Sequence, residues 1–117
     1  IIADQLIVGG YAMFALEGLS MKKPVLCYIA DDKLDLFEVA GLIKREEIPI
    51  LNCNPFTVKD QIRNLLDHRE TWTEIGEKSR AFVIKYHSFS AIGKIFHEIN
   101  REIGLNPSKK VKTVIEN

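Results

Sequence analysis

The fold is decided by residues 3–29, which read ADQLIVGGYAMFALEGLSMKKPVLCYI. Residues 3–8 form an apolar run after Asp4, without alternation, which is typical of a strand buried on both faces. Two glycines end this run, and helix formers then fill residues 12–22, up to a proline. Residues 24–29 form a second apolar run. The stretch therefore predicts a strand, a glycine turn, a helix and a second strand.

The rest of the chain continues this alternation and then becomes helical. The pattern predicts a helix at 34–43, a charged turn at 44–47, a strand at 48–52 and helices that start at Thr57, Thr71 and Ser88 or Ser90. Thr57 and Thr71 are each followed three residues later by an acidic residue, as in a capping box. Gly104 is expected to end the last helix. This order predicts an α/β fold, a parallel sheet with helices on both faces.

Composition narrows the class of protein. The 117 residues suffice for one small domain, and the formal net charge of zero gives no electrostatic case for nucleic acid binding. No apolar run reaches the roughly 18 residues of a membrane span, and the lysines of residues 106–117 are too few to indicate membrane contact. Cys27 and Cys53 are expected to be buried thiols, which predicts a cytoplasmic location. No feature specifies an oligomeric state.

The glycine turn and one carboxylate are the candidate binding groups. A turn at Gly9 and Gly10 before a helix allows close backbone approach and presents free N–H groups to a phosphate, although it is equally the mark of a plain βα turn. Glu17 is the only charged residue between Ala12 and Leu19. Its carboxylate can accept two hydrogen bonds from a vicinal diol such as a ribose. The alternative is that Glu17 points into solvent or pairs with a lysine.

The remaining polar residues give weaker indications. Asp31 and Asp32 follow a predicted strand, where an acidic pair can bind Mg²⁺ or accept a phosphate, but a helix N-cap is the favoured reading. His68, His87 and His97 have no metal-ligand spacing. No nucleophile–histidine arrangement or P-loop is present in the sequence.

Residues 14–25 carry a resemblance to a known family. They are similar to the second half of a motif in the carboxyl-terminal domain of retaining glycosyltransferases with the GT-B fold, the family-four group. That motif runs from a glutamate and a glycine-rich turn through a second glutamate to Gly-x-Pro-Val. The similarity continues at residues 48–50, 54–55, 57–66, 75–80 and 86–89.

The resemblance implies a Rossmann-like carboxyl half of a GT-B fold that binds a nucleotide-sugar donor without a metal. It implies a site made of Glu17, Gly9, Gly10, Tyr11, Ala12, Met13 and Phe14. In it, Glu17 would bind the ribose, and the backbone amides from Gly10 to Met13 would face the donor sugar and the diphosphate. Gly9 stands where the family has its first glutamate, and Ala12 and Lys23 replace two usual glycines.

The expected function is transfer of a sugar, with retention, from a UDP- or GDP-linked donor to an acceptor. Residues 1–105 would be part of the donor-binding domain, and residues 106–117 a polar tail or linker. The family's diphosphate-binding arginine and lysine, and its amino-terminal acceptor domain, lie upstream of the motif. We therefore expect this piece alone to be inactive. The alternatives are another sugar-nucleotide enzyme of the same fold, epimerase-like, or a non-enzymatic α/β binding module.

Overall fold

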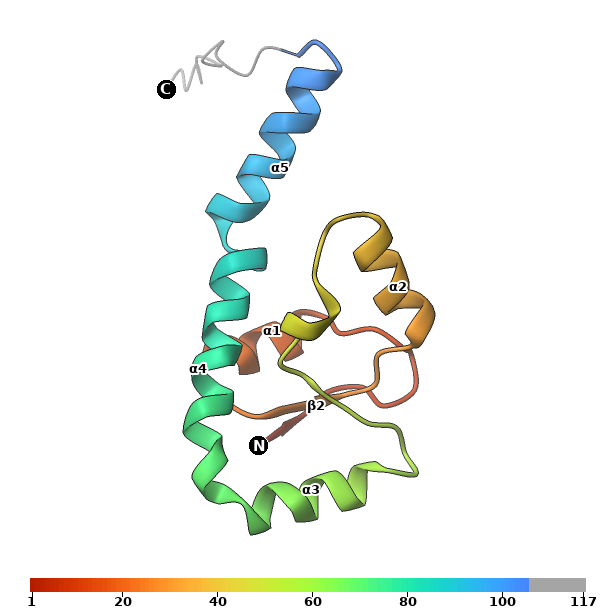
Figure 1. The fold of residues 1–117 in the computed structure, drawn as a ribbon, viewed down its shortest axis with the longest axis vertical. Helices are drawn as coiled ribbons and strands as arrows, with labels where there is room; N and C mark the ends of the chain where they lie inside the picture. Colours follow the sequence, from red (N-terminus) through yellow and green to blue (C-terminus); the bar gives the residue numbers. More distant parts are fainter. Residues whose placement is uncertain (106–117) are drawn as a thin grey trace, which may run out of the picture.

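The computed structural model describes residues 1–105, which form an α/β fold around a small parallel sheet (Figure 1). The strands are β1 (Ile2–Ala3), β2 (Val25–Cys27) and β3 (Leu51–Asn52). The α-helices are α1 (Met13–Ser20), α2 (Asp31–Val39), α3 (Val58–Asp67), α4 (Trp72–Phe82) and α5 (Phe89–Glu102). Three short turns of helix are η1 (Arg45–Glu47), η2 (Arg69–Thr71) and the π-helical η3 (Val83–His87). The predicted order of strands and helices is confirmed.

The sheet has the order β1-β2-β3, with every pair parallel. Ile2 lies opposite Val25 in the first pair, and Leu26 lies opposite Leu51 in the second. Beyond the regular ladder, the side-chain amide of Asn52 bonds to the backbone of Ile29 as another strand residue would. Its oxygen accepts from the N–H of Ile29 at 2.9 Å, and its nitrogen donates to the C=O of Ile29 at 2.8 Å. This amide extends the contact between the second and third strands past the last ladder pair.

The predicted strand at residues 3–8 is wrong in extent, because β1 stops at Ala3. Ile7 and Val8 are 78% and 82% exposed. Their backbone N–H groups donate to the side-chain oxygen of Gln5, at 3.1 and 2.6 Å. Since this side chain takes the donors that a neighbouring strand would need, the segment folds into a loop although its residues are apolar.

Helices cover both faces of the sheet, as predicted. Successive residues of β2 point to opposite faces. One face carries a buried cluster of Ala15, Leu19, Val25, Cys27, Ile29, Leu34, Ile43, Ile50 and Phe82. The other carries Leu26, Cys53 and Leu65, with the half-buried Trp72 and Ile75 packed against them. In Figure 1, α1 and α2 lie above β2 and α3 lies below it. Helices α1 and α2 contribute to the same cluster and so cover the same face, as the general rule of right-handed crossovers between neighbouring parallel strands predicts.

Glycines allow two close approaches of backbone to neighbouring elements. At Gly18, an added Cβ would lie 2.8 Å from Ile2 Cδ1 and 2.9 Å from Val25 Cγ2, so this glycine lets α1 lie directly on β1 and β2. At Gly76, an added Cβ would meet the backbone of Lys22. This second glycine lets α4 lie directly on the turn that follows α1.

Three helices end in the same way, with a Schellman motif. After α2 and α5 the left-handed residue is a glycine, Gly41 at φ 64° and Gly104 at φ 78°. After α1 it is Lys22, at φ 57°. There Lys22 N–H donates to Leu19 C=O and Lys23 N–H to Gly18 C=O, each at 3.0 Å. The left-handed conformation that favours glycine is therefore at Lys22. The resemblance had placed the replaced glycine one residue later, at Lys23.

The two capping boxes predicted at Thr57 and Thr71 are wrong. Neither threonine side chain caps its helix. Thr57 Oγ1 instead accepts the N–H of Asn54 at 3.0 Å, and Thr71 Oγ1 donates to the C=O of His68 at 2.8 Å. Both hydroxyls are therefore engaged by the preceding turn. The cap predicted at Ser88 or Ser90 is confirmed at Ser88, whose Oγ accepts from Ala91 N–H at 3.1 Å.

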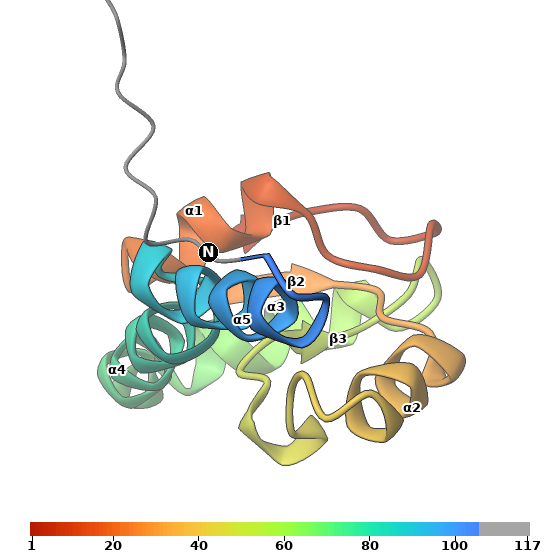
Figure 2. The same cartoon turned by 90° about the horizontal axis from the view of Figure 1, so that it is seen from above.

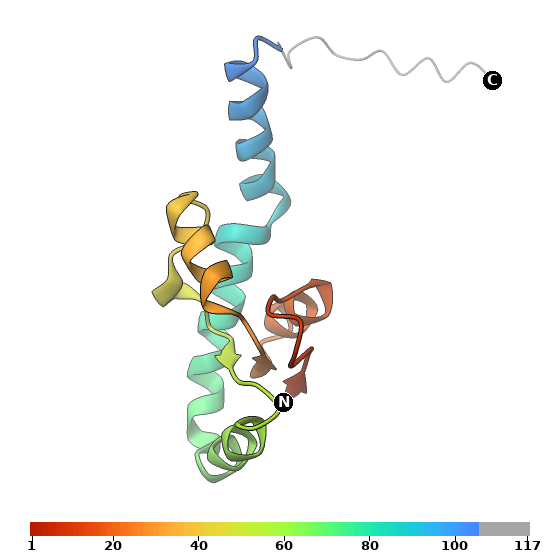
Figure 3. The same ribbon diagram turned by 90° about the vertical axis from the view of Figure 1, so that its right-hand side faces the viewer.

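Helix α5 extends away from the sheet (Figure 3). Seen from above, it points along the long axis of the molecule, so that its turns overlap in projection (Figure 2). None of its residues is buried. Its apolar positions, which predicted the helix correctly, remain on the surface: Phe89, Ile92, Ile95, Phe96, Ile99 and Ile103. The predicted tail at 106–117 lies outside the described residues.

Candidate functional site

The carboxyl edge of the sheet gathers the loops that follow the three strands. Because the strands are parallel, these loops leave the sheet on the same side, and α1, α2 and α3 all begin there. The first two loops are joined directly: Ala30 N–H donates to Gly9 C=O at 3.2 Å, and Gln5 Nε2 donates to Tyr28 C=O at 3.0 Å. This edge is where a ligand of an open α/β sheet is expected.

Gln5 holds the loop after β1 in place. Its amide nitrogen donates to the carbonyl of Gly10 and contacts Cys27 Sγ at 3.3 Å, while its oxygen accepts two N–H groups further along the loop. One side chain thus fixes the glycine turn to the end of β2. The sequence pattern did not predict a role for Gln5. The signal for it was a polar amide inside an otherwise apolar run.

Gly9 is explained by backbone geometry. It is buried, its φ is 83°, and a Cβ added to it would lie 3.0 Å from the Cβ of Ala30. A glutamate here would be strained in its backbone and would meet the loop after β2. Gly9 therefore has a structural role in this chain. At Gly10, by contrast, an added Cβ would meet nothing within 4 Å.

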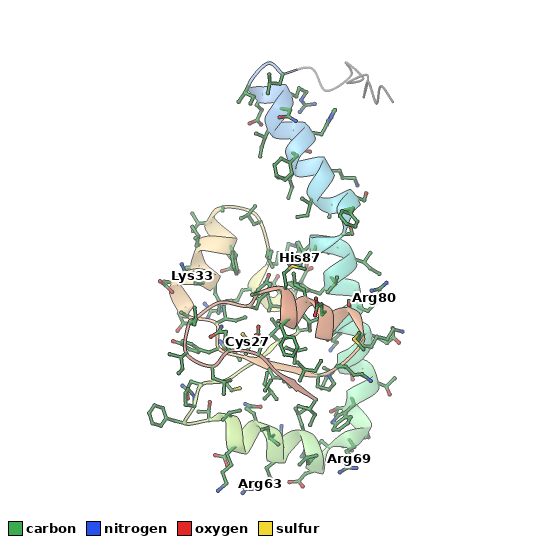
Figure 4. The ribbon with its side chains drawn as sticks, turned by 180° about the vertical axis from the view of Figure 1, so that it is seen from behind. Cys27, Lys33, Arg63, Arg69, Arg80 and His87 are labelled. Atoms are coloured by element: carbon green, nitrogen blue, oxygen red, sulfur yellow. The ribbon has the colours of Figure 1, made fainter. Side chains whose placement is uncertain are left out.

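Tyr11 is half-buried and packs against the core. Its hydroxyl lies 3.1 Å from His87 Nε2, and its ring packs edge-on against Phe82, with centroids 6.3 Å apart. Burial raises the pKa of Tyr11 to about 12 and lowers the pKa of His87 from its ordinary value. Both groups are therefore neutral near pH 7. Figure 4 shows His87 beside α1. Because His87 lies in η3, between α4 and α5, its bond to Tyr11 connects these two helices to the segment that precedes α1.

The amino terminus of α1 is free of side-chain caps. Its N-cap residue is Ala12, and its first turn holds no acidic residue. The first N–H groups of a helix have no partner within it and carry the positive end of its dipole. Helix α2 differs, because Asp31 and Asp32 occupy its first turn. Of the three helices that begin at this edge, α1 is the one whose first turn contains no acidic side chain that could compete for these N–H groups.

Glu17 lies on the exposed face of α1. It shares this face with Met13 and Phe14, which are 67% and 54% exposed and precede it by four and three residues. The opposite face, with Ala15 and Leu19, is buried. Of the ion pairs within residues 1–105, none includes Glu17, so the alternative of a lysine partner is not realised there. The other half of the alternative, that Glu17 points into solvent, is what the structure shows, because this residue is exposed.

The acidic pair after β2 has a structural role. The favoured N-cap reading of Asp31 and Asp32 is wrong by one position, because Ala30 is the N-cap and the aspartates fill the first turn. There they complement the helix dipole, and Asp31 also pairs with Arg45. Within residues 1–105, no group of three or more His, Cys, Asp or Glu side chains is arranged to hold a metal ion.

Both cysteines are free and buried, as predicted. Cys27 lies near the centre of the molecule (Figure 4). Its pKa is raised to about 11, first by burial and then by the charge of Asp4, whose carboxylate lies 3.8 Å from the sulfur. A thiol with so high a pKa is not a nucleophile near pH 7.

Comparison with known proteins does not identify a family. The chain matches no protein-family model, no curated protein and no solved structure. Among residues 1–105, the helices are all too short or too polar to cross a membrane.

Proposed function

We propose that this chain is the donor-binding part of a retaining glycosyltransferase, the carboxyl half of a GT-B fold. One observation carries the proposal: the braced glycine turn leads directly into the uncapped start of α1, and Glu17 stands on the exposed face of that helix. The resemblance of residues 14–25 to the family motif adds to it. The proposed donor is a UDP- or GDP-linked sugar.

The arrangement fits two parts of a nucleotide-sugar, the diphosphate and the ribose. Four residues of α-helix advance about 6 Å, so Glu17 lies roughly one turn beyond the first N–H groups, which start at Met13. A diphosphate at those N–H groups would leave the ribose within reach of the carboxylate. A helix terminus is an established seat for phosphate, and a carboxylate accepts both hydroxyls of a diol. The exposed side chain of Phe14 offers a flat apolar surface beside them.

In the proposed reaction the diphosphate leaves with the negative charge. Fixed N–H groups at the start of α1 would stabilise that charge without rearranging, which is the usual way in which such a site lowers a barrier. The arginine and lysine that the family uses for the same purpose, and the residues that bind the acceptor, would come from outside this chain. We therefore propose that residues 1–117 bind a donor weakly and do not transfer its sugar.

The sheet order supports the proposed fold. The crossovers β1-α1-β2 and β2-α2-β3 place both helices on one face, as in one half of a Rossmann-like sheet. Within residues 1–105, β1 has a partner strand on one side only. Its other edge would join the remaining half of the sheet, and the donor would then lie at the topological switch point.

Calorimetry with UDP-glucose and GDP-mannose tests the proposal. Replacing Glu17 by Gln should weaken binding by about 10- to 100-fold, since a hydrogen bond to a charged group contributes ~1.5–3 kcal/mol. The matched control is Glu98→Gln, which changes an exposed carboxylate on α5 and should leave the affinity unchanged. Donor binding that is equal in both variants would refute the role of Glu17, and fast sugar transfer by the chain alone would refute the proposed division of the enzyme.

A further inference from the structure

A cavity lies between the start of α1, the end of α2, η3 and α5, so that it adjoins the start of the helix where the donor is proposed. It has a volume of about 460 Å³. Its walls are mainly apolar and include Met13, Leu16, Phe37, Leu42, Ile92 and Ile95. Cavities that bind small molecules have this size and this composition, with a few polar groups that orient the ligand.

The polar groups of this cavity are Tyr11 and His87, which are hydrogen-bonded to each other at 3.1 Å. If the tyrosine hydroxyl donates to Nε2, the histidine carries its proton on Nδ1 and keeps that N–H as a further donor. If instead Nε2–H donates to the tyrosine, the hydroxyl proton remains available. In either tautomer the pair has one donor left over, and within residues 1–105 neither group has another hydrogen-bond partner.

The backbone and one further bond direct these side chains. Residues 83–87 form a π-helical turn, a rare geometry that is frequent at functional sites. Tyr86 also lines the cavity, but its hydroxyl donates to the carboxylate of Glu47 at 2.8 Å and is therefore already used. This leaves the pair of Tyr11 and His87 as the group that a ligand would meet.

We propose that this cavity binds a small uncharged amphiphile, with an apolar body of alkyl or aromatic carbon and one oxygen that accepts a hydrogen bond from the Tyr11–His87 pair. A charged ligand is disfavoured, because an apolar wall repays none of the cost of removing its hydration. The cavity shares Tyr11, Ala12 and Met13 with the proposed donor site. The two proposals are still tested separately, because Glu17 does not line the cavity and Ile95 is not part of the donor site.

The test uses methyl octanoate, a neutral ester, titrated into the 117-residue chain and followed by isothermal calorimetry and by shifts of the isoleucine methyl signals. Octanoate is the charged comparison. We expect binding of one ester per chain and at least roughly tenfold weaker binding of octanoate. Ile95→Trp should fill the cavity and weaken ester binding by about tenfold or more. Ile95 is 38% exposed, so this substitution does not disturb a core.

The matched control is Ile99→Trp, one turn further along α5 and outside the cavity. It should leave the affinity within about twofold of the parent. The double variant Tyr11→Phe, His87→Phe removes the spare donor in either tautomer and should weaken ester binding by about fivefold. Absence of ester binding to the folded chain overturns the proposal. Equal loss of binding in Ile95→Trp and Ile99→Trp also overturns it, and identifies the whole apolar face of α5 as the contact surface.

Discussion

The helix α4 crosses the end of α1 where Gly76 faces the carbonyl oxygen of Lys22. A Cβ placed on Gly76 would lie 2.6 Å from that oxygen and 3.0 Å from the Cβ of Lys22. The first contact is with backbone, which cannot rotate away as a side chain can. The approach of α4 to the sheet therefore depends on the absence of one methyl group.

Replacing Gly76 by Ala should lower the free energy of unfolding by about 2–3 kcal/mol, since over-packing costs ~1–3 kcal/mol and the obstacle here is backbone. Urea denaturation measures the change. The matched control is Gly93→Ala, on the exposed part of α5, where an added Cβ meets nothing within 4 Å. It should be neutral or should stabilise its helix by up to ~1 kcal/mol. A stability loss of the same size in both variants would contradict this account.

Lys22 occupies the left-handed position of a Schellman motif that is filled by glycine at the ends of α2 and α5. A side chain in this conformation costs ~1–2 kcal/mol. Lys22→Gly should therefore raise the free energy of unfolding by up to ~1 kcal/mol, net of the exposed ion pair with Glu77. Lys23→Gly, at the next residue, should lower it. Thermal unfolding of the two variants gives the sign, and stabilisation by the second rather than the first would show that strain is not located at Lys22.

Gln5→Ala should release the loop after β1. The carbonyl of Gly10 and the N–H groups of Ile7 and Val8 would lose their partner. These groups are partly exposed, so water replaces some of the bonds, and a loss of about 1–2 kcal/mol is expected. Donor affinity should fall with it, if the glycine turn is a donor site. Gln61→Ala, on α3, is the control, and the prediction fails if it destabilises the chain as strongly.

The pH dependence of stability should include a contribution from His87. Burial lowers its pKa below the ordinary value, so between the two values the unfolded chain binds the proton and the folded chain does not. Stability from this group is fully present above the unfolded pKa, near 6.5, and is lost as the pH falls below it. Urea midpoints from pH 7.5 to pH 5 should decrease more steeply in the parent than in His87→Gln. Replacement of the exposed His68 is the comparison, and it should not flatten the curve as much.

The sequence pattern predicted the elements well where local spacing decides them. The apolar spacing of residues 89–103 predicted α5, but a pattern cannot say whether a partner covers the stripe, and none of these side chains is buried. The sequence pattern failed for residues 3–8, because the hydrogen bonds from Gln5 to its own loop outweigh the strand propensity of these residues. Capping by Thr57 failed for a similar reason, since Asn54 uses the same hydroxyl. The structural role of Gly9 could not be predicted from local spacing, because it depends on the contact with Ala30, which lies 21 residues further along the chain.

The exposure of α5 sets a gradient of protection against hydrogen exchange. With no buried side chain, its 14 residues gain little from tertiary packing, and isolated helices of this length are marginal in water. Its amides should therefore exchange through local opening at a cost far below that of β2, whose three residues are fully buried. Any molecule that covers the apolar face of α5 would slow exchange along the whole helix, and the pattern of slowed amides would give the extent of the covered surface.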